Sequence, residues 1–191
     1  MKNSFLYLMT ALVVLAAVPA AASAQKLKSE EFLAKHLESL GSPEARNAVK
    51  NRMAVGNVVV TFISQKNQTV AGRAVLVSAD SRNFFGMNLN GSDYTSEKFT
   101  FDGKKAGVGF AFNGIRSVLG NFVQSNSWII DESLFSGTLA SSWALASAVP
   151  KGKVSYNGVK KSDGKEFHVV GYSRKGGGDV DVKLFSEKDT F

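Results

Sequence analysis

Residues capable of acid–base or metal chemistry are few in this chain. It contains two histidines and no cysteine. His36 lies in an apolar helical pattern and has no second histidine four positions away, the spacing of a metal-binding pair on a helix. His168 lies two residues from Glu166, so on a strand the two side chains share a face, but one such pair specifies neither a metal site nor an acid–base couple. We therefore interpret both histidines as structural and expect no metal site.

The motifs of common catalytic sites are missing from the sequence. It has no His-Glu-x-x-His metal motif and no Gly-x-Ser-x-Gly nucleophile elbow. Residues 176–178 are three glycines, but they precede a predicted strand, whereas phosphate binds where a loop enters a helix. We expect no catalytic residue and no cofactor. An exported enzyme is one alternative function for this chain. A cleft lined by polar groups with shifted pKa values would favour it.

The N-terminus has the features of a secretory signal peptide. Lys2 precedes an apolar run from Phe5 to Val18, and the small residues 20–24 follow soon after. The run is shorter than the roughly 20 apolar residues that span a membrane. We predict that residues 1–24 are a cleaved signal peptide and that the protein is periplasmic. The lack of cysteine excludes a lipid anchor at the cleavage point as well as disulfides, which favours a bacterial envelope.

The remainder, residues 25–191, has the length of a single domain. Removing 24 residues from 191 leaves 167, enough for one domain with its own core. Loss of Lys2 lowers the net charge from +7 to +6, which favours anionic lipid headgroups or nucleic acid as partners or has no specific meaning. The expected partners are an anionic membrane surface or a membrane-embedded donor or acceptor protein. No nucleic-acid-binding motif accompanies the charge, so no nucleic acid is expected. Three basic doublets lie beside predicted turns, where they either meet lipid headgroups or are solvated hairpin tips: Lys104-Lys105, Lys160-Lys161 and Arg174-Lys175.

Two helices are predicted before the first strand. Apolar residues recur at helical spacing for about three turns from Ser29. Ser42 and Pro43 fit the N-cap and the first position of a second helix, whose pattern continues through Met53 to Gly56.

From residue 58 onward the pattern alternates, as expected for strands. The predicted strands cover residues 58–63, 70–78, 84–89, 97–101, 105–110, 153–156, 166–172 and 179–185. Asp102-Gly103 fits a tight hairpin turn in which both residues have positive φ. Between residues 115 and 145 apolar residues return to helical spacing. The predicted fold class is α+β, an antiparallel meander with N-terminal helices and a mid-chain apolar helical insert.

Several patterns along the mature chain resemble those of a known family. They are the strand after Gly72, Phe99-x-Phe101-Asp102-Gly103-Lys104-Lys105, the apolar insert, Ser162-Asp163-Gly164-Lys165-x-Phe167 and Val180-x-Val182-x-Leu184-Phe185. With them, residues 27–191 resemble the LolA-like periplasmic lipoprotein and lipid carriers. The resemblance implies a curled antiparallel sheet, an incomplete β-barrel, around an apolar cavity that helices cover as a lid. It also implies one or two further strands after residues 186–191, which leaves open whether the domain ends at Phe191.

A carrier of this kind, a chaperone in lipoprotein transport, must shield acyl chains from water. Burying a chain of about 16 carbons is worth roughly 12 kcal/mol at about 0.8 kcal/mol per methylene, so extraction needs an apolar cavity. We expect this cavity to be lined by Met87, Phe99, Phe101, Leu119, Phe122, Trp128, Phe135 and Trp143. The same residues also fit a filled core, and a register shift of one would exchange the lining for its complement. We predict a carrier that binds a lipid or acylated protein; the alternative is a non-catalytic envelope interaction or structural protein on the same scaffold.

Overall fold

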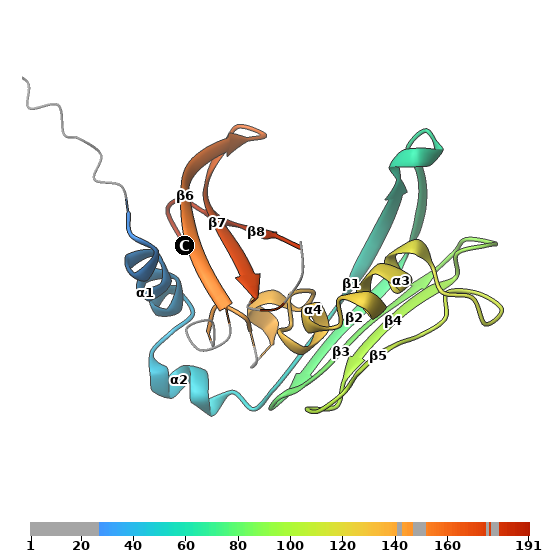
Figure 1. Ribbon diagram of the computed structural model, residues 1–191, viewed down its shortest axis with the longest axis horizontal. Coiled ribbons are helices and arrows are strands. Elements are labelled where there is room, and N and C mark those ends of the chain that lie inside the picture. Colours follow the sequence, from blue (N-terminus) through green and yellow to red (C-terminus); the bar gives the residue numbers. More distant parts are fainter. Residues whose placement is uncertain (1–26, 141–142, 147–151, 175, 177–179) are drawn as a thin grey trace, which may run out of the picture.

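The computed structural model of the protein describes residues 27–140, 143–146, 152–174, 176 and 180–191. The predicted signal peptide, residues 1–24, lies outside the described residues. In the described chain an antiparallel sheet of five strands and another of three lie side by side without joining into a closed barrel (Figure 1). The prediction of an α+β fold built on an open antiparallel sheet is confirmed at this level, although the strands form two sheets.

Two helices precede the sheets, as the sequence predicts. α1 (Ser29–Ser39) buries Phe32 and His36. α2 (Pro43–Ala48) begins with proline, and its N-cap is Ser42, whose side chain accepts a hydrogen bond from the backbone N–H of Ala45.

The predicted continuation of the second helix through Met53 is wrong. The backbone is already extended at Val49, and β1 (Asn51–Phe62) begins two residues later. β1 pairs along its whole length with β2 (Gln68–Ala79), and its β-branched residues favour this extended backbone over a helix.

The larger sheet is a meander in which each strand pairs antiparallel with the next. After β1 and β2 it contains β3 (Arg82–Leu89), β4 (Ser96–Phe101) and β5 (Ala106–Val108). Directly opposed residues point to the same side of a sheet, so the register assigns each side chain to a face. We call the face that bears Phe85 and Phe99 the inner face, and the face that bears Val55 and Val75 the outer face.

The turn between β4 and β5 corrects one expectation. Gly103 has a φ of 95°, but Asp102 does not have positive φ. The Oδ1 atom of Asp102 instead accepts hydrogen bonds from the backbone N–H groups of Lys104 at 2.8 Å and Lys105 at 2.7 Å. This side-chain-to-backbone turn therefore needs one left-handed residue, not two.

Acid should loosen this turn, because the N–H groups of Lys105 and Lys104 hold the pKa of Asp102 below its ordinary value. A carboxylate whose pKa falls on folding stabilises the fold above its unfolded pKa, and that contribution is lost below about pH 4. We expect an NMR titration of the Asp102 carboxyl carbon to give a midpoint below that of an unfolded peptide. Asp102→Ala should remove the change with pH in the protection factors of the Lys104 and Lys105 amides, measured relative to their intrinsic exchange rates, and a midpoint at the peptide value would contradict this account.

The smaller sheet contains β6 (Gly152–Ser162), β7 (Lys165–Arg174) and β8 (Val182–Glu187). β6 extends well beyond the predicted strand, because a bulge between Tyr156 and Val159 lets its pairing with β7 continue. The last predicted strand, residues 179–185, overlaps β8, but its first residue lies outside the described part of the chain.

The insert contains α3 (Val118–Ser125), α4 (Trp128–Asp131) and the short 3-10 helix η2 (Gly137–Leu139). Ile115, expected in the first helix, lies before it in an isolated bridge with Phe112. α4 contacts β3, β4 and β5, and α3 contacts β5 (Figure 1). Among the described helices none is long and apolar enough to cross a membrane.

Two neighbouring residues of α4 belong to different cores. Ile130 packs with Phe99 of the inner face, whereas Ile129 packs with Phe32 of α1 and Val170 of β7. The insert therefore connects the two sheets through buried apolar contacts.

Candidate functional site

The structure divides the eight predicted lining residues among three environments. Phe99, Phe101 and Phe135 pack together on the inner face, and Met87 is buried on that face. Trp128 and Trp143 are buried in the other core, with α1 and the three-stranded sheet. Leu119 and Phe122 lie on α3 and are 37% and 45% exposed. These residues therefore do not line one common cavity.

The inner face beneath the insert is filled by side chains. The rings of Phe85, Phe99 and Phe135 stack on one another, with centroids 5.0 Å apart for Phe99 and Phe135. The cavity beside these rings measures about 10 Å³, roughly the space of one water molecule. An acyl chain has no room there in this conformation.

A larger hollow lies on the outer face of the five-stranded sheet. Its volume is about 580 Å³ and it is open to solvent. Outer-face residues that line it include Val55, Arg73, Val75, Phe84, Gly86, Asn88, Ser96, Lys98 and Gly109, and Phe110 lines it as well. We call this hollow the outer groove.

Glycines form part of the floor of the outer groove. A Cβ atom at Gly86 would lie 2.7 Å from the ring of Phe84, so the ring lies in the space that a side chain would fill. A Cβ atom at Gly109 would lie 2.9 Å from the Cβ atom of Lys98. Neighbouring side chains therefore pack over both glycines, and the apolar side chains of Val75 and Phe84 line the groove.

The sequence reasoning missed this groove. Arg73, Val75 and Val77 alternate along one strand with Ala74 and Leu76, so both faces of that strand carry apolar side chains. Periodicity alone does not show which of two apolar faces is covered. The register of β2 with β3 assigns Arg73, Val75 and Val77 to the outer face. This register depends on pairing between strands, which the sequence of one strand does not reveal.

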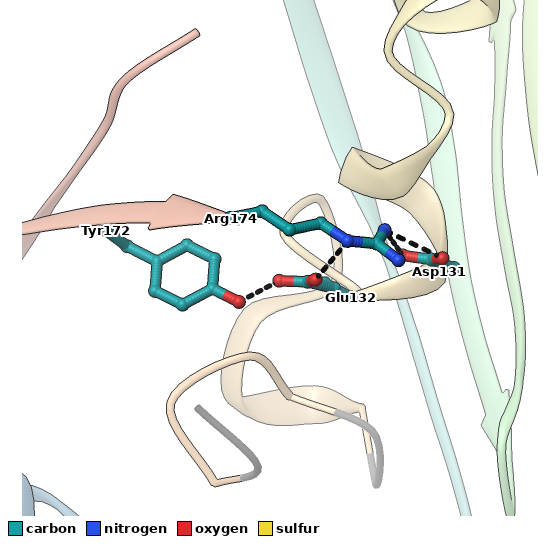
Figure 2. Close-up of polar contacts among 4 residues, drawn as sticks. All are labelled: Asp131, Glu132, Tyr172 and Arg174. Atoms are coloured by element: carbon teal, nitrogen blue, oxygen red, sulfur yellow. Dashed lines mark hydrogen bonds and ion pairs between the residues drawn. The ribbon is translucent and has the colours of Figure 1, made fainter. Parts of the chain in front are cut away.

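A polar cluster attaches the insert to the smaller sheet (Figure 2). Glu132 at the end of α4 is 1% exposed and accepts a hydrogen bond from the hydroxyl of Tyr172. Arg174 forms ion pairs with Glu132 at 3.3 Å and with Asp131 at 3.0 Å. Burial and the bond to Glu132 raise the pKa of Tyr172 well above its ordinary value, so the phenol remains a donor. Arg174 of the third basic doublet is therefore committed to this cluster.

A second polar contact attaches α3 to the larger sheet. Glu97 is 2% exposed, and its Oε1 atom accepts hydrogen bonds from the hydroxyls of Tyr94, at 2.7 Å, and Ser117. Ser117 is the N-cap of α3 and accepts a bond from the N–H of Gly120 at 2.8 Å. Burial raises the pKa of Tyr94 well above its ordinary value. One hydroxyl thus links the helix terminus to a buried carboxylate.

Ser117→Ala should destabilise the protein by about 1–2 kcal/mol, because it removes a helix N-cap and a donor to a buried carboxylate. Ser127→Ala is the matched control, since the side chain of Ser127 makes no capping bond at the start of α4. The control should lie within about 0.5 kcal/mol of the unchanged protein. Urea denaturation measures both, and equal losses would contradict the role given to Ser117.

Both histidines lie in hydrogen-bonded packing. His36 accepts a bond from the indole N–H of Trp143 at 3.0 Å, so its Nδ1 carries the proton and donates to the backbone oxygen of Phe191 at 2.6 Å. His168 contacts the hydroxyl of Tyr156 at 2.9 Å, not Glu166, which pairs with Lys188. Among the described residues no cluster of three metal-ligating side chains occurs.

Another hollow, of about 450 Å³, lies where α2 meets the start of β1. Its two arginines form hydrogen bonds to backbone carbonyl oxygens of the fold. Arg46 donates to the carbonyl oxygens of Leu37, at 2.6 Å, and Gly41, and Arg52 donates to the carbonyl oxygen of Thr138. The outer groove is the better candidate site because its charged side chains are not used in this way.

No family model matches this chain, and no curated protein matches it. A solved structure, that of a DUF1329 family protein from Desulfovibrio piger, is similar to it over 85% of this chain and 69% of the other. The sequence identity is 10% and the TM-score is 0.33. A likeness at this level carries no argument about the function or the site.

Proposed function

We propose that this protein is a periplasmic carrier of a lipid or an acylated protein, and that it holds an acyl chain in the outer groove. The observation that carries the proposal is the groove itself, about 580 Å³ of open space walled by Val55, Val75, Phe84 and Phe110. Sites for small ligands typically measure roughly 300–1,000 Å³. Each methylene removed from water by such walls contributes roughly 0.8 kcal/mol.

Further features support this function. The signal-peptide pattern of residues 1–24 would deliver the protein to the envelope, where acylated molecules are available. The open antiparallel sheets are compatible with the curled sheet of the LolA-like resemblance, although they are two sheets and not one. The positive net charge favours approach to an anionic membrane surface. The proposed site differs from the expected one, because the inner face is filled and the outer face is open.

The second candidate function is that of a non-catalytic interaction or structural protein of the envelope. The exposed apolar side chains of α3 favour it, since Val118, Leu119 and Phe122 are 89%, 37% and 45% exposed. Contact with a partner protein would remove these side chains from water.

Val55→Glu tests the carrier function. Val55 lies on an edge strand and is 54% exposed, so the fold should tolerate glutamate there. The new carboxylate would lose water next to a bound acyl chain, which is unfavourable. We expect at least a tenfold loss of affinity for a fluorescent fatty acyl probe. The matched control is Val59→Glu, on the same strand and face and 63% exposed but outside the groove, which should stay within twofold.

Native mass spectrometry of the protein purified from its envelope without detergent would identify the cargo. A stoichiometric lipid or acyl adduct that Val59→Glu retains and Val55→Glu loses would support the carrier. A protein without adduct that takes up no offered phospholipid or acylated peptide would contradict it and leave the interaction protein.

A further inference from the structure

We infer that the outer groove selects amphiphiles with an anionic head group, a carboxylate or a phosphate monoester, which binds between Arg73 and Lys98. The inference rests on the proposed function, because it names the class of molecule that the same groove would carry.

The register divides the outer face into an apolar part and a polar part. One transverse row contains Met53, Val77, Phe84 and Thr100, and the next contains Val55, Val75, Gly86 and Lys98. The following row contains Asn57, Arg73, Asn88 and Ser96, all with hydrogen-bonding side chains. A molecule lying across these rows would have its apolar part over valines and phenylalanine and its polar end over donors. This is the division expected for an amphiphile.

Arg73 and Lys98 are placed to contact the same head group. They lie on β2 and β4, two strands apart across β3 and one row (two residues) apart along the strands, so their backbones are roughly 12 Å apart at about 4.8 Å per strand and about 3.4 Å per residue. On β3, between them, Asn88 is opposite Arg73 and Gly86 is opposite Lys98. Both cationic side chains are long enough to reach a group held between them over β3. A guanidinium binds carboxylate or phosphate through paired hydrogen bonds, and the ammonium adds a second charge.

The charge of the groove is not balanced by nearby acids. Neither Arg73 nor Lys98 forms an ion pair with another described residue, and both are exposed. Glu97 is the one acid among the described residues that line the groove. Its carboxylate belongs to the inner face, where it is bound by Tyr94 and Ser117. The outer groove therefore presents two cations and no carboxylate beside an apolar wall.

The test compares three ligands that share one alkyl chain: laurate, dodecyl phosphate and dodecanol, each kept below its aggregation limit. Isothermal titration of the full chain should show laurate and dodecyl phosphate binding at least tenfold more tightly than dodecanol. Arg73→Gln and Lys98→Gln should each lower affinity for the two anions about tenfold, since a hydrogen bond to a charged group contributes that much. Affinity for dodecanol should change less than twofold.

Controls separate this inference from the function on which it rests. Lys153→Gln changes an exposed lysine of the other sheet and should leave all three affinities unchanged. Equal binding of laurate and dodecanol, or equal losses for both in Arg73→Gln, would overturn the head-group selection while the carrier function stands. Inorganic phosphate binding as tightly as dodecyl phosphate would overturn it in favour of a simple anion site. Failure of all three amphiphiles to bind would instead overturn the carrier function itself.

Discussion

Arg174→Ala should lower the free energy of unfolding by about 3 kcal/mol and lower the melting temperature by several degrees. The guanidinium contacts both Asp131 and Glu132, and Glu132 is 1% exposed. Removing the cation would leave a buried carboxylate whose remaining partner in this cluster is the hydroxyl of Tyr172. The loss of one partner from a buried ion pair is expensive because the other charge stays desolvated. The side chain of Arg174 is itself 33% exposed, which places the expected loss at the lower end for such pairs.

Lys165→Ala is the matched control for this prediction. Lys165 pairs with Glu187 at 2.6 Å, but the two side chains are 66% and 49% exposed, so the loss should not exceed about 1 kcal/mol. Adding Glu132→Gln to Arg174→Ala should recover part of the stability, because the amide carries no charge to desolvate. Chemical denaturation of the four proteins measures these differences. Equal losses for Arg174→Ala and Lys165→Ala would show that water reaches the cluster.

Elements defined by local pattern could be predicted from the sequence. α1 was predictable because its apolar residues recur at helical spacing, and α2 because Ser42 and Pro43 mark its beginning. The meander followed from alternating β-branched runs separated by turns. The end of α2 was not predictable, because Met53 and its neighbours fit a helix as well as a strand until pairing with β2 is considered.

The candidate site depends on contacts that no local pattern encodes. Ile129 and Ile130 are chemically alike and adjacent, yet each packs in a different core. Arg174 finds its partners 42 and 43 residues away in the sequence, and no local signal connects them. Val55 and Val58 are both apolar, but they lie on opposite faces of β1, so Val55 lines the outer groove and Val58 does not. The insert could therefore be predicted as apolar and helical, but not the surface that it would cover.

Phe99→Ala should be strongly destabilising, by about 3–5 kcal/mol, whereas Phe122→Ala should cost less than about 1 kcal/mol. The ring of Phe99 is completely buried and stacks on Phe85 and Phe135. Its removal would leave a void that the surrounding rings cannot close fully. Phe122 is 45% exposed on α3 and loses little contact when truncated. Both residues were predicted to line a lipid cavity, so comparing the two losses of stability distinguishes a filled inner face from an open cavity.

Thermal and urea denaturation of the two variants, without ligand, measure this difference. If the insert were raised from the inner face in solution, Phe99 would line an open cavity and its truncation would cost little more than that of Phe122. Similar small losses would therefore contradict a filled inner face and return the acyl-binding site to the space beneath the insert. A large loss for Phe99→Ala with unchanged probe affinity for Phe122→Ala would instead support binding on the outer face. The outer groove then provides apolar surface for an acyl chain without requiring α3 and α4 to leave the core that they complete.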